Sequence, residues 1–512
     1  MTHRWRAGLA VASGLLLWLS FPNPFAMHFE AWTGALAFVA LVPLLALLAD
    51  LAPAQGFQYG FVAGAAFFLP GLVWITNVKP LGLGAVPAWC GLAAWCALFV
   101  GAFGGLAALG LRRGLSLPLL WLPALWTLLE ALREHLLTGF PWLSLGSSQF
   151  ANPVLLPLAA LTGQPGLHFA VVLVNTVVCA ILLRPRWVLG WARTLSALLV
   201  LAALAAGARQ QAQLQRSWDT DGPPAGSSTA FQGLKVGVIQ GGIDQDQAWN
   251  QAYRDQLMDT YLTYSSAAEE QGANLILWPE SSFPGFFNED APESERVRAF
   301  ARSRKVTLLI GSTLSKDGKY SNSAVLVPPS GEVQTYAKRH LVPFGEYVPF
   351  RSWVPFLDRA LEQFGIADFT AGTQAGAFHV HGAVVAPLIC YESVFPDLPG
   401  QGEAPDLLAL LTVDTWYGIS PGPVWHASQA AIRAVENGCW VARAAATGIS
   451  LVAAPSGEIR LQIGLAEAGA LVQALGPARP TPFRAWGNWF LVLCVLILLL
   501  AWAGSGIRRK NA

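Results

Sequence analysis

The chain has 512 residues, of which 54% are hydrophobic and 12% are charged, whereas charged residues make up about 25% of a typical soluble protein. Its formal net charge is +1, and the absence of a basic excess excludes nucleic-acid binding as an expected function. The composition therefore predicts a protein with a large membrane-embedded part.

Apolar segments of about 20 residues, the length that crosses a bilayer, recur through the first half of the chain. We predict seven spans, at residues 7–22, 31–50, 57–77, 84–110, 117–135, 166–184 and 187–207, and an eighth at 487–507. The first span has the basic start and apolar core of a signal peptide, but the spans that follow it favour a retained helix. Many of the 21 tryptophans lie near span ends, as in an aromatic belt.

Basic residues between the spans predict the orientation of the chain, because cytoplasmic loops are enriched in Lys and Arg. With eight spans, four basic clusters fall on one side: Arg4 and Arg6, Arg112 and Arg113, Arg184 and Arg186, and Arg508 to Lys510. The connection after the seventh span falls on the other side. The large polar domain within this connection is thus predicted to lie outside the cytoplasm.

The polar part of the chain begins with a linker at 208–232, which is rich in Gln and then in Gly, Pro and Ser. From 233 to 486, short β-branched runs alternate with helical stretches, which predicts one α/β domain with helices covering sheet faces. The expected strands are Leu234–Gln240, Asn274–Trp278, Val306–Thr313, Ala324–Val327, Val384–Cys390 and Leu407–Val413. The expected helices are Asp255–Gln271, Glu293–Arg304 and Pro423–Asn437.

Three residues at the edges of apolar runs could together perform acyl transfer: Glu280, Lys338 and Cys390. A thiolate attacks a carbonyl, a carboxylate takes the thiol proton, and a cation stabilises the developing oxyanion. Each residue also has a structural alternative. Glu280 could be an acid at a helix N-terminus, Lys338 a surface lysine, and Cys390 a buried apolar residue at a strand end.

Further residues nearby extend this hypothesis. Glu346 and Glu392 lie close in sequence to Lys338 and Cys390 and could hold the lysine charged and oriented, although they could equally form ordinary surface pairs. Cys390 and Cys439 are the two cysteines of the polar half, whereas the other four lie in apolar stretches. A Cys390–Cys439 disulfide stays an open alternative, and it would destroy the nucleophile.

Three segments of the chain resemble one known family. Trp278–Glu280, Lys338 within Tyr336–Tyr347 (YAKRHLVPFGEY) and the run Cys390–Glu392 look like the Glu-Lys-Cys signature of the nitrilase superfamily. The long lysine motif, together with Thr138–Trp142 and residues 146–149 (GSSQ), resembles more specifically the apolipoprotein N-acyltransferase family. This resemblance covers essentially the whole chain.

The resemblance implies a multi-span helical membrane domain plus an αββα sandwich. It implies transfer of an acyl chain from a phospholipid to the N-terminal amine of a diacylglyceryl-cysteine apolipoprotein, through a thioester, without a cofactor or metal. Cys390 would be the nucleophile, Glu280 the general base and Lys338 the oxyanion stabiliser. The same resemblance gives the supporting residues as Glu346, Tyr391 and Glu392, and the possible substrate contacts as Tyr347 and Trp416.

The expected setting is the bacterial cytoplasmic membrane, with the catalytic domain on its extracytoplasmic face and the protein acting as a monomer. Two positions depart from the family pattern, since Val413 and Ala446 stand where asparagine is usual. We expect these changes to affect pocket polarity, substrate preference or rate. His426 and Arg433 are interpreted as structural residues of a helix, and Trp416 and Tyr417 could also be simple packing residues.

Two alternative functions use the same residues differently. A membrane-anchored amidase or nitrilase-type hydrolase would use the same three groups with water as acceptor, but seven helices exceed what anchoring requires. A non-catalytic membrane receptor or scaffold is disfavoured because all three catalytic residues are present.

Overall fold

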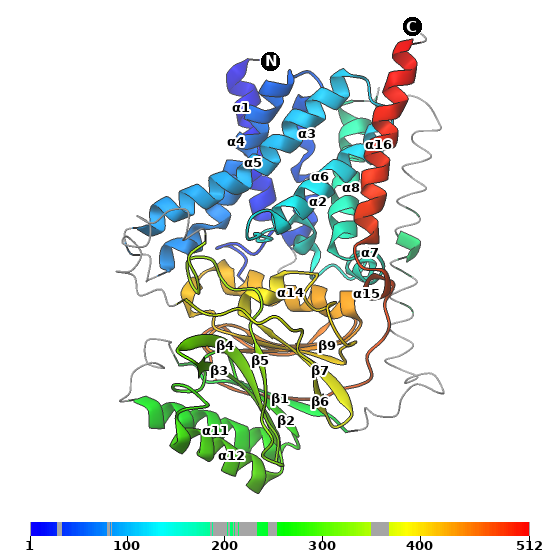
Figure 1. Ribbon diagram of the computed structural model, residues 1–512. Helices are drawn as coiled ribbons and strands as arrows, with labels where there is room; N and C mark the ends of the chain where they lie inside the picture. Colours follow the sequence, from blue (N-terminus) through cyan, green and yellow to red (C-terminus); the bar gives the residue numbers. More distant parts are fainter. Residues whose placement is uncertain are drawn as a thin grey trace.

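The computed structural model describes residues 2–27, 33–78, 84–184, 233–243, 253–349 and 368–510, with a few single residues between these ranges. Helices from the first 184 residues and the C-terminal helix form one end of the molecule, and the strands form the other (Figure 1). The predicted seventh span at 187–207 and the linker at 208–232 lie outside the described ranges.

The helical half contains a helix at each predicted span that falls within the described ranges. Its helices are α1 (His3–Leu19), α2 (Ala37–Ala40), α3 (Val42–Leu48), α4 (Pro53–Gly71), α5 (Ala85–Arg112), α6 (Pro118–His135), α7 (Ala159–Thr162), α8 (Gln164–Leu182), α15 (Pro482–Trp486) and α16 (Trp489–Lys510). The predicted second span is broken into α2 and α3. By length and composition, α5 and α8 are the described helices that could cross a membrane.

Small residues let α4 and α5 pack closely. Gly56, Gly60 and Gly64 repeat every fourth residue, so they lie on one face of α4. A Cβ atom on Gly60 would lie 2.5 Å from the Val100 carbonyl oxygen of α5, and one on Gly56 would lie 2.5 Å from that of Gly104. Such small-residue stripes allow the backbones of membrane helices to approach each other.

The polar half contains two six-stranded sheets. The first has the order β12-β1-β2-β3-β4-β5, with β1 (Lys235–Gln240), β2 (Leu275–Leu277), β3 (Thr307–Lys316), β4 (Lys319–Val327), β5 (Gln334–Ala337) and β12 (Gly469–Ala474). The second has the order β11-β10-β9-β8-β7-β6, with β6 (Phe378–Val380), β7 (Ala383–Ile389), β8 (Leu407–Thr412), β9 (Trp440–Ala445), β10 (Ser450–Ala453) and β11 (Ile459–Ile463). Strands β1, β2 and β3 are parallel, as are β7, β8 and β9.

Alternating side chains divide each sheet between two cores. Val236 and Val238 of β1 belong to the core that also contains Leu407 and Ala409 of β8, so the two sheets pack face to face. Ile239 instead joins the core beneath α11 (Arg254–Glu270) and α12 (Ala291–Arg304). The outer face of the second sheet packs on α14 (Pro421–Asn437). The expected αββα sandwich is therefore confirmed.

Helix α14 lies between the second sheet and the helical half (Figure 1). Ala427 and Ala430 pack against the sheet, whereas Ala431, Ile432 and Val435 pack against residues of η5 (Leu156–Leu158), α7 and α8. Every α14 residue from Gly422 onward is accordingly buried. This helix joins the two halves of the molecule into one packed body.

Candidate active site

Cys390 stands directly after β7, at the start of the 3₁₀ turn η10 (Cys390–Val394). Its backbone has φ +49°, a left-handed conformation that is uncommon for a residue with a side chain and is often found at functional sites. The side chain is buried. Cys390 and Cys439 are both free thiols, so the disulfide alternative is wrong.

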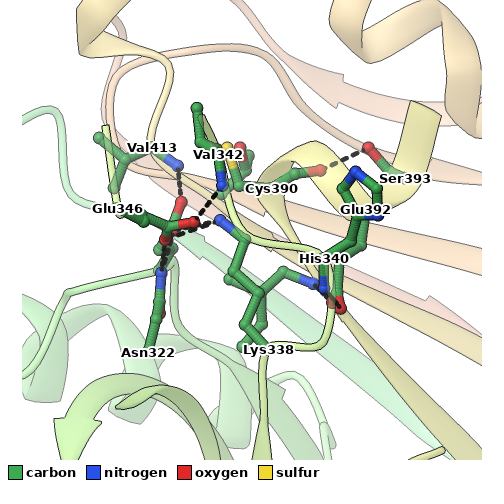
Figure 2. A network of polar contacts seen from close by, with 12 residues as sticks. Asn322, Lys338, His340, Val342, Glu346, Cys390, Glu392, Ser393 and Val413 are labelled. Carbon is green, nitrogen blue, oxygen red and sulfur yellow. Dashed lines mark hydrogen bonds and ion pairs between the residues drawn. The ribbon is translucent and has the colours of Figure 1, made fainter. Parts of the chain in front are cut away.

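Lys338 follows β5 directly and is almost completely buried, at 1% exposure. Its Nζ donates to Oε1 of Glu346 at 2.9 Å (Figure 2). The same nitrogen lies 3.5 Å from Oε1 of Glu280. Two carboxylates therefore hold one ammonium beside the Cys390 turn. The interpretation of Lys338 as a surface lysine is wrong.

Glu280 lies in the turn after β2, and no helix begins there, because α12 starts only at Ala291. The interpretation as a helix N-terminal acid is thus wrong. Its Oε2 accepts a hydrogen bond from the Val413 backbone N–H at 3.0 Å. The turn lies against Gly311 of β3, where a Cβ atom would come within 2.4 Å of the Glu280 Cα. Glycine at 311 is required for this close approach.

Asn322 of β4 is part of the site, and the sequence reasoning missed it. Its Nδ2 donates to Oε1 of Glu280 and to Oε1 of Glu346, both at 2.7 Å. The backbone N–H of Lys338 also donates to the Asn322 carbonyl oxygen at 2.8 Å. One available signal was that asparagine is depleted in strand interiors, so its presence in a strand suggests a specific role.

For the acyl transfer that the sequence predicts, replacing Asn322 with leucine is expected to slow acylation of Cys390 about tenfold at neutral pH, because hydrogen bonds to charged groups contribute about 1.5–3 kcal/mol. The Asn322 amide lowers the pKa of Glu280, so its removal raises that pKa further and moves the acidic limb of the pH–rate profile to higher pH. Single-turnover rates across pH measure both effects. Asn288→Leu, at an exposed position, is the control. If the acidic limb of the pH–rate profile of Asn322→Leu lies at the wild-type pH, the assigned role of Asn322 is contradicted.

Glu392 is fully buried. It connects the cysteine turn (Cys390–Val394) with the lysine segment (Tyr336–Tyr347). Its Oε2 accepts from the Ile389 N–H at 2.7 Å, and its Oε1 accepts from the Tyr336 hydroxyl and the Arg339 N–H, each at 2.7 Å. It does not hydrogen-bond to Lys338 in the described structure. Glu392 therefore positions the two segments that carry Cys390 and Lys338, and neither it nor the buried Glu346 forms an ordinary surface pair.

Glu392→Gln keeps the size of the side chain but turns one acceptor oxygen into an amide that faces N–H or O–H donors. We expect a loss of about 2 kcal/mol in the free energy of unfolding, as for a buried hydrogen bond to a charged group. Thermal unfolding in detergent measures this loss. Glu458→Gln, at an exposed position, should leave the unfolding temperature unchanged, and equal temperatures for the two variants contradict the bridging role.

Burial and the neighbouring charges shift the pKa values of Cys390, Glu280 and Lys338. Burial, and next the negative charge of Glu280, raise the pKa of Cys390 well above its usual range. Burial also raises the pKa of Glu280, while the Lys338 ammonium opposes that rise. Burial alone would lower the pKa of Lys338, but the negative charges of Glu346 and Glu280 outweigh it and raise that pKa above its usual range. Because Cys390 and Glu280 lie in the same site, proton transfer from Cys390 to Glu280 leaves the net charge of the site unchanged.

The remaining predicted residues lie at the edge of the site. Tyr391 points away from Lys338, since its hydroxyl donates to the Gly139 carbonyl oxygen of the helical half at 3.0 Å. Tyr347 lines a cavity of about 590 Å³ at the boundary with the helical half, together with Leu137 and His340. Trp416 lies in η11 (Thr415–Tyr417) and is 36% exposed.

A second buried network, made by Asp414, His426 and Arg443, contacts the backbone and Ser393 of the cysteine turn. His426 Nδ1 lies 2.9 Å from Oδ1 of Asp414, and Arg443 donates to Oδ2 of the same carboxylate at 2.8 Å. His426 Nε2 reaches the Ser393 hydroxyl at 3.0 Å and the Cys390 carbonyl oxygen at 3.2 Å. His426 is buried, as its place on an inward helix face predicts, but its contact with the Cys390 backbone was not foreseen.

The two departures from the family pattern lie together beside Glu280. Val413 and Ala446 both line a small cavity of about 10 Å³ that Glu280 and Tyr261 also line. The contact from position 413 to Glu280 is made by the backbone N–H, which valine retains. The apolar side chains thus change the surroundings of Glu280 and leave its hydrogen bond in place.

Comparisons with known proteins match both halves of the chain. The family model of the apolipoprotein N-acyltransferase N-terminal domain matches residues 13–177 of this chain. The family model of the carbon-nitrogen hydrolases matches residues 235–484. An apolipoprotein N-acyltransferase of Geobacter metallireducens is 35% identical, over 98% of this chain and 95% of that protein. One of Pseudomonas syringae pv. tomato is 34% identical, over 97% and 96%. The crystal structure of an amidase from Nesterenkonia sp. is 22% identical with a TM-score of 0.38, covering 52% of this chain and 98% of that one.

Proposed function

The chain belongs to the apolipoprotein N-acyltransferase family, and from this premise we propose that it moves an acyl chain from a membrane phospholipid to a diacylated apolipoprotein. The acceptor is the N-terminal amine of the diacylglyceryl-cysteine, and the intermediate is a thioester on Cys390. The protein is accordingly an acyltransferase, and the reaction is a step of lipoprotein maturation.

One observation carries this proposal: the buried Lys338 ammonium lies between Glu280 and Glu346, next to the Cys390 turn. Burial of an ammonium is costly unless opposite charges compensate it. A site that places this cation beside a thiol and a carboxylate is arranged to stabilise negative charge on a reacting oxygen.

In the first half-reaction, Glu280 takes the proton of Cys390 and the thiolate attacks the ester carbonyl of the phospholipid. Negative charge then develops on the carbonyl oxygen, where Lys338 stabilises it. The tetrahedral intermediate collapses when the C–O bond of the ester breaks, and Glu280 returns the proton to the leaving lysophospholipid alkoxide. The products are the thioester and a lysophospholipid.

In the second half-reaction, the amine of the apolipoprotein attacks the thioester carbonyl. Glu280 accepts a proton from the attacking amine, and Lys338 again stabilises the oxyanion. The C–S bond then breaks, and the thiolate regains the proton from Glu280. The amide product leaves, and the site returns to its starting charge.

We place this reaction at the bacterial cytoplasmic membrane, with the sandwich on the extracytoplasmic side. We assign residues 1–207 to the membrane domain, 208–232 to the linker, 233–486 to the catalytic domain and 487–512 to the last span with its basic tail. The support is the positive-inside pattern together with the two family matches. The start of α1 and the end of α16 also lie at the end of the molecule remote from the sandwich (Figure 1).

The cavity of about 590 Å³ beside the lysine segment is our candidate for the lipid part of a substrate. Leu137, Phe369 and Phe395 supply apolar lining from both halves of the molecule.

Trp416 and Ile419 are exposed near the contact between η11 and the helical half, where Asn77 donates to the Tyr417 carbonyl oxygen. Exposed apolar side chains at such a boundary suit contact with acyl chains.

The test is acyl-enzyme trapping in detergent micelles. The purified protein is incubated with a phospholipid that carries a labelled acyl chain, and the label that hydroxylamine releases is measured. Unlabelled diacylated lipopeptide, or buffer alone, is then added, and the compound to which the label moves is identified. Label that moves to the lipopeptide amine supports the transferase, whereas equal release as free fatty acid in both chases supports the hydrolase. The absence of any labelled protein contradicts the thioester.

A further inference from the structure

A short segment of the helical half lies against both catalytic segments. Residues Thr138–Trp142 follow the end of α6 and precede η4 (Leu145–Gln149). One contact from this segment reaches the lysine segment, and another reaches the cysteine turn. The sequence singles out Thr138–Trp142 as a motif, but the proposed chemistry gives it no task.

The contact with the lysine segment is made by His340, two residues after Lys338. Its Nε2 lies 3.1 Å from the carbonyl oxygen of Thr138. A carbonyl oxygen can only accept a hydrogen bond, so Nε2 carries the proton. The backbone N–H of His340 also donates to Glu392 at 3.2 Å, and its ring packs 3.9 Å from that of Phe395. His340 therefore holds a fixed place in the lysine segment.

The contact with the cysteine turn is made by the Tyr391 hydroxyl, which donates to the Gly139 carbonyl oxygen. Neighbouring carbonyls of one segment thus accept one bond from each catalytic segment. Gly139 has φ +73°, and a Cβ atom there would lie 2.1 Å from the Glu134 carbonyl oxygen. The shape of the segment accordingly depends on glycine at this position.

The segment is itself anchored in the interior of the helical half. Arg133, a buried residue of α6, donates through NH1 to the Phe140 carbonyl oxygen at 2.5 Å and to that of Trp142 at 2.8 Å. Its NH2 pairs with buried Glu130. A charge-assisted hydrogen bond to a backbone carbonyl is stronger than a neutral one. Arg133 consequently ties residues Thr138–Trp142 to the interior of the helical half.

We propose that His340 is a positioning residue of the reaction, and that its bond to Thr138 fixes Lys338 relative to Cys390 through the helical half. The inference deepens the proposed function and rests on it, because its readout is the Cys390 thioester. Misplacement of a reacting group by about 1 Å can cost about 10²-fold in rate. Loss of the His340–Thr138 bond should therefore slow the chemistry without removing any reacting group.

The test compares His340→Leu with His340→Gln by single-turnover thioester formation from labelled phospholipid. Gln places its Nε2 near the position of the histidine Nε2 and can donate to Thr138, whereas Leu cannot. We expect His340→Leu to lower the rate at saturating lipid about 10–100-fold, and His340→Gln to recover most of that loss. His379→Leu, at an exposed histidine of β6, is the control and should match the wild type. His340→Asn, whose amide is too short to reach Thr138, replaces the leucine variant if that does not fold.

The outcomes separate this inference from the proposed function. If the wild type forms a thioester and His340→Leu forms it at the same rate, the positioning role is wrong and the proposed function stands. If His340→Gln is as slow as His340→Leu, the hydrogen bond is not the cause, and the inference is overturned. If the wild type forms no thioester at all, the proposed function and the inference fail together.

Discussion

Replacing Cys390 with alanine is expected to abolish the hydroxylamine-sensitive adduct and to lower acyl transfer by at least about 10⁴-fold, as loss of a nucleophile does in other covalent enzymes. Among the described cysteines, Cys390 is the one that lies beside Lys338 and Glu280. No other thiol in the described part of the site can form the same thioester. Labelled-lipid trapping, followed by release with neutral hydroxylamine, measures the effect.

Cys439→Ala is the matched control, since Cys439 is also a buried free thiol of the sandwich. It should retain wild-type labelling even if its stability falls. Cys390→Ser adds a chemical check, because a serine ester resists neutral hydroxylamine whereas a thioester does not. Release of label from the serine variant at the wild-type rate would show that the acyl group resides on another residue.

The sequence motifs identified three residues that the structure brings together, and each of them follows a strand directly or within a short turn. Cys390 follows β7, which the α/β pattern predicted, whereas Lys338 follows β5, which that pattern did not predict, so the lysine was found from its sequence motif. Local hydrophobic patterns predicted β1 to β4, β7, β8, α11, α12 and α14 within a few residues. The short strands β5 and β6, and the later strands β9 to β12, were not predicted.

Contacts between distant segments could not be predicted from local patterns. Asn322 lies 42 residues from Glu280 and 24 from Glu346 in sequence, and only the pairing of β4 with β3 and β5 brings it between the two carboxylates. Tyr391 shows the converse, since it neighbours Cys390 in the chain but points into the helical half. The left-handed backbone at Cys390, which the sequence does not reveal, sets the course of the turn from which Tyr391 projects.

The same limit applies to helix α14. Its sequence indicates a helix with His426 and Arg433 on one inward face, and both residues are buried. The structure buries the opposite face as well, because the helical half covers it. A contact between two domains separated by a long connection leaves no local pattern, so the burial of this second face emerges only from the packed structure. The network of Asp414, His426 and the Cys390 carbonyl lies within the sandwich, but it joins segments 12 and 36 residues apart and has no local pattern either.

Replacing Lys338 with methionine is expected to reduce thioester formation by more than about 10³-fold, since one electrostatic stabiliser contributes about 10²–10³. A second effect adds to the first. The Lys338 ammonium lowers the pKa of Glu280, so its removal raises that pKa and leaves the base protonated over more of the pH range. The acidic limb of the pH–rate profile should therefore move to higher pH. Single-turnover rates across pH measure both effects.

Loss of Lys338 also leaves two buried carboxylates without their partner, and breaking such a pair costs about 3–5 kcal/mol of stability. A double variant separates folding from chemistry, because Glu346→Gln removes one of the uncompensated charges. Lys338→Met with Glu346→Gln should regain thermal stability but not the rate, and Lys319→Met, at an exposed lysine of β4, should lose neither. If the double variant regains the acylation rate together with stability, Lys338 serves to neutralise its neighbours, and the oxyanion must be stabilised by another group.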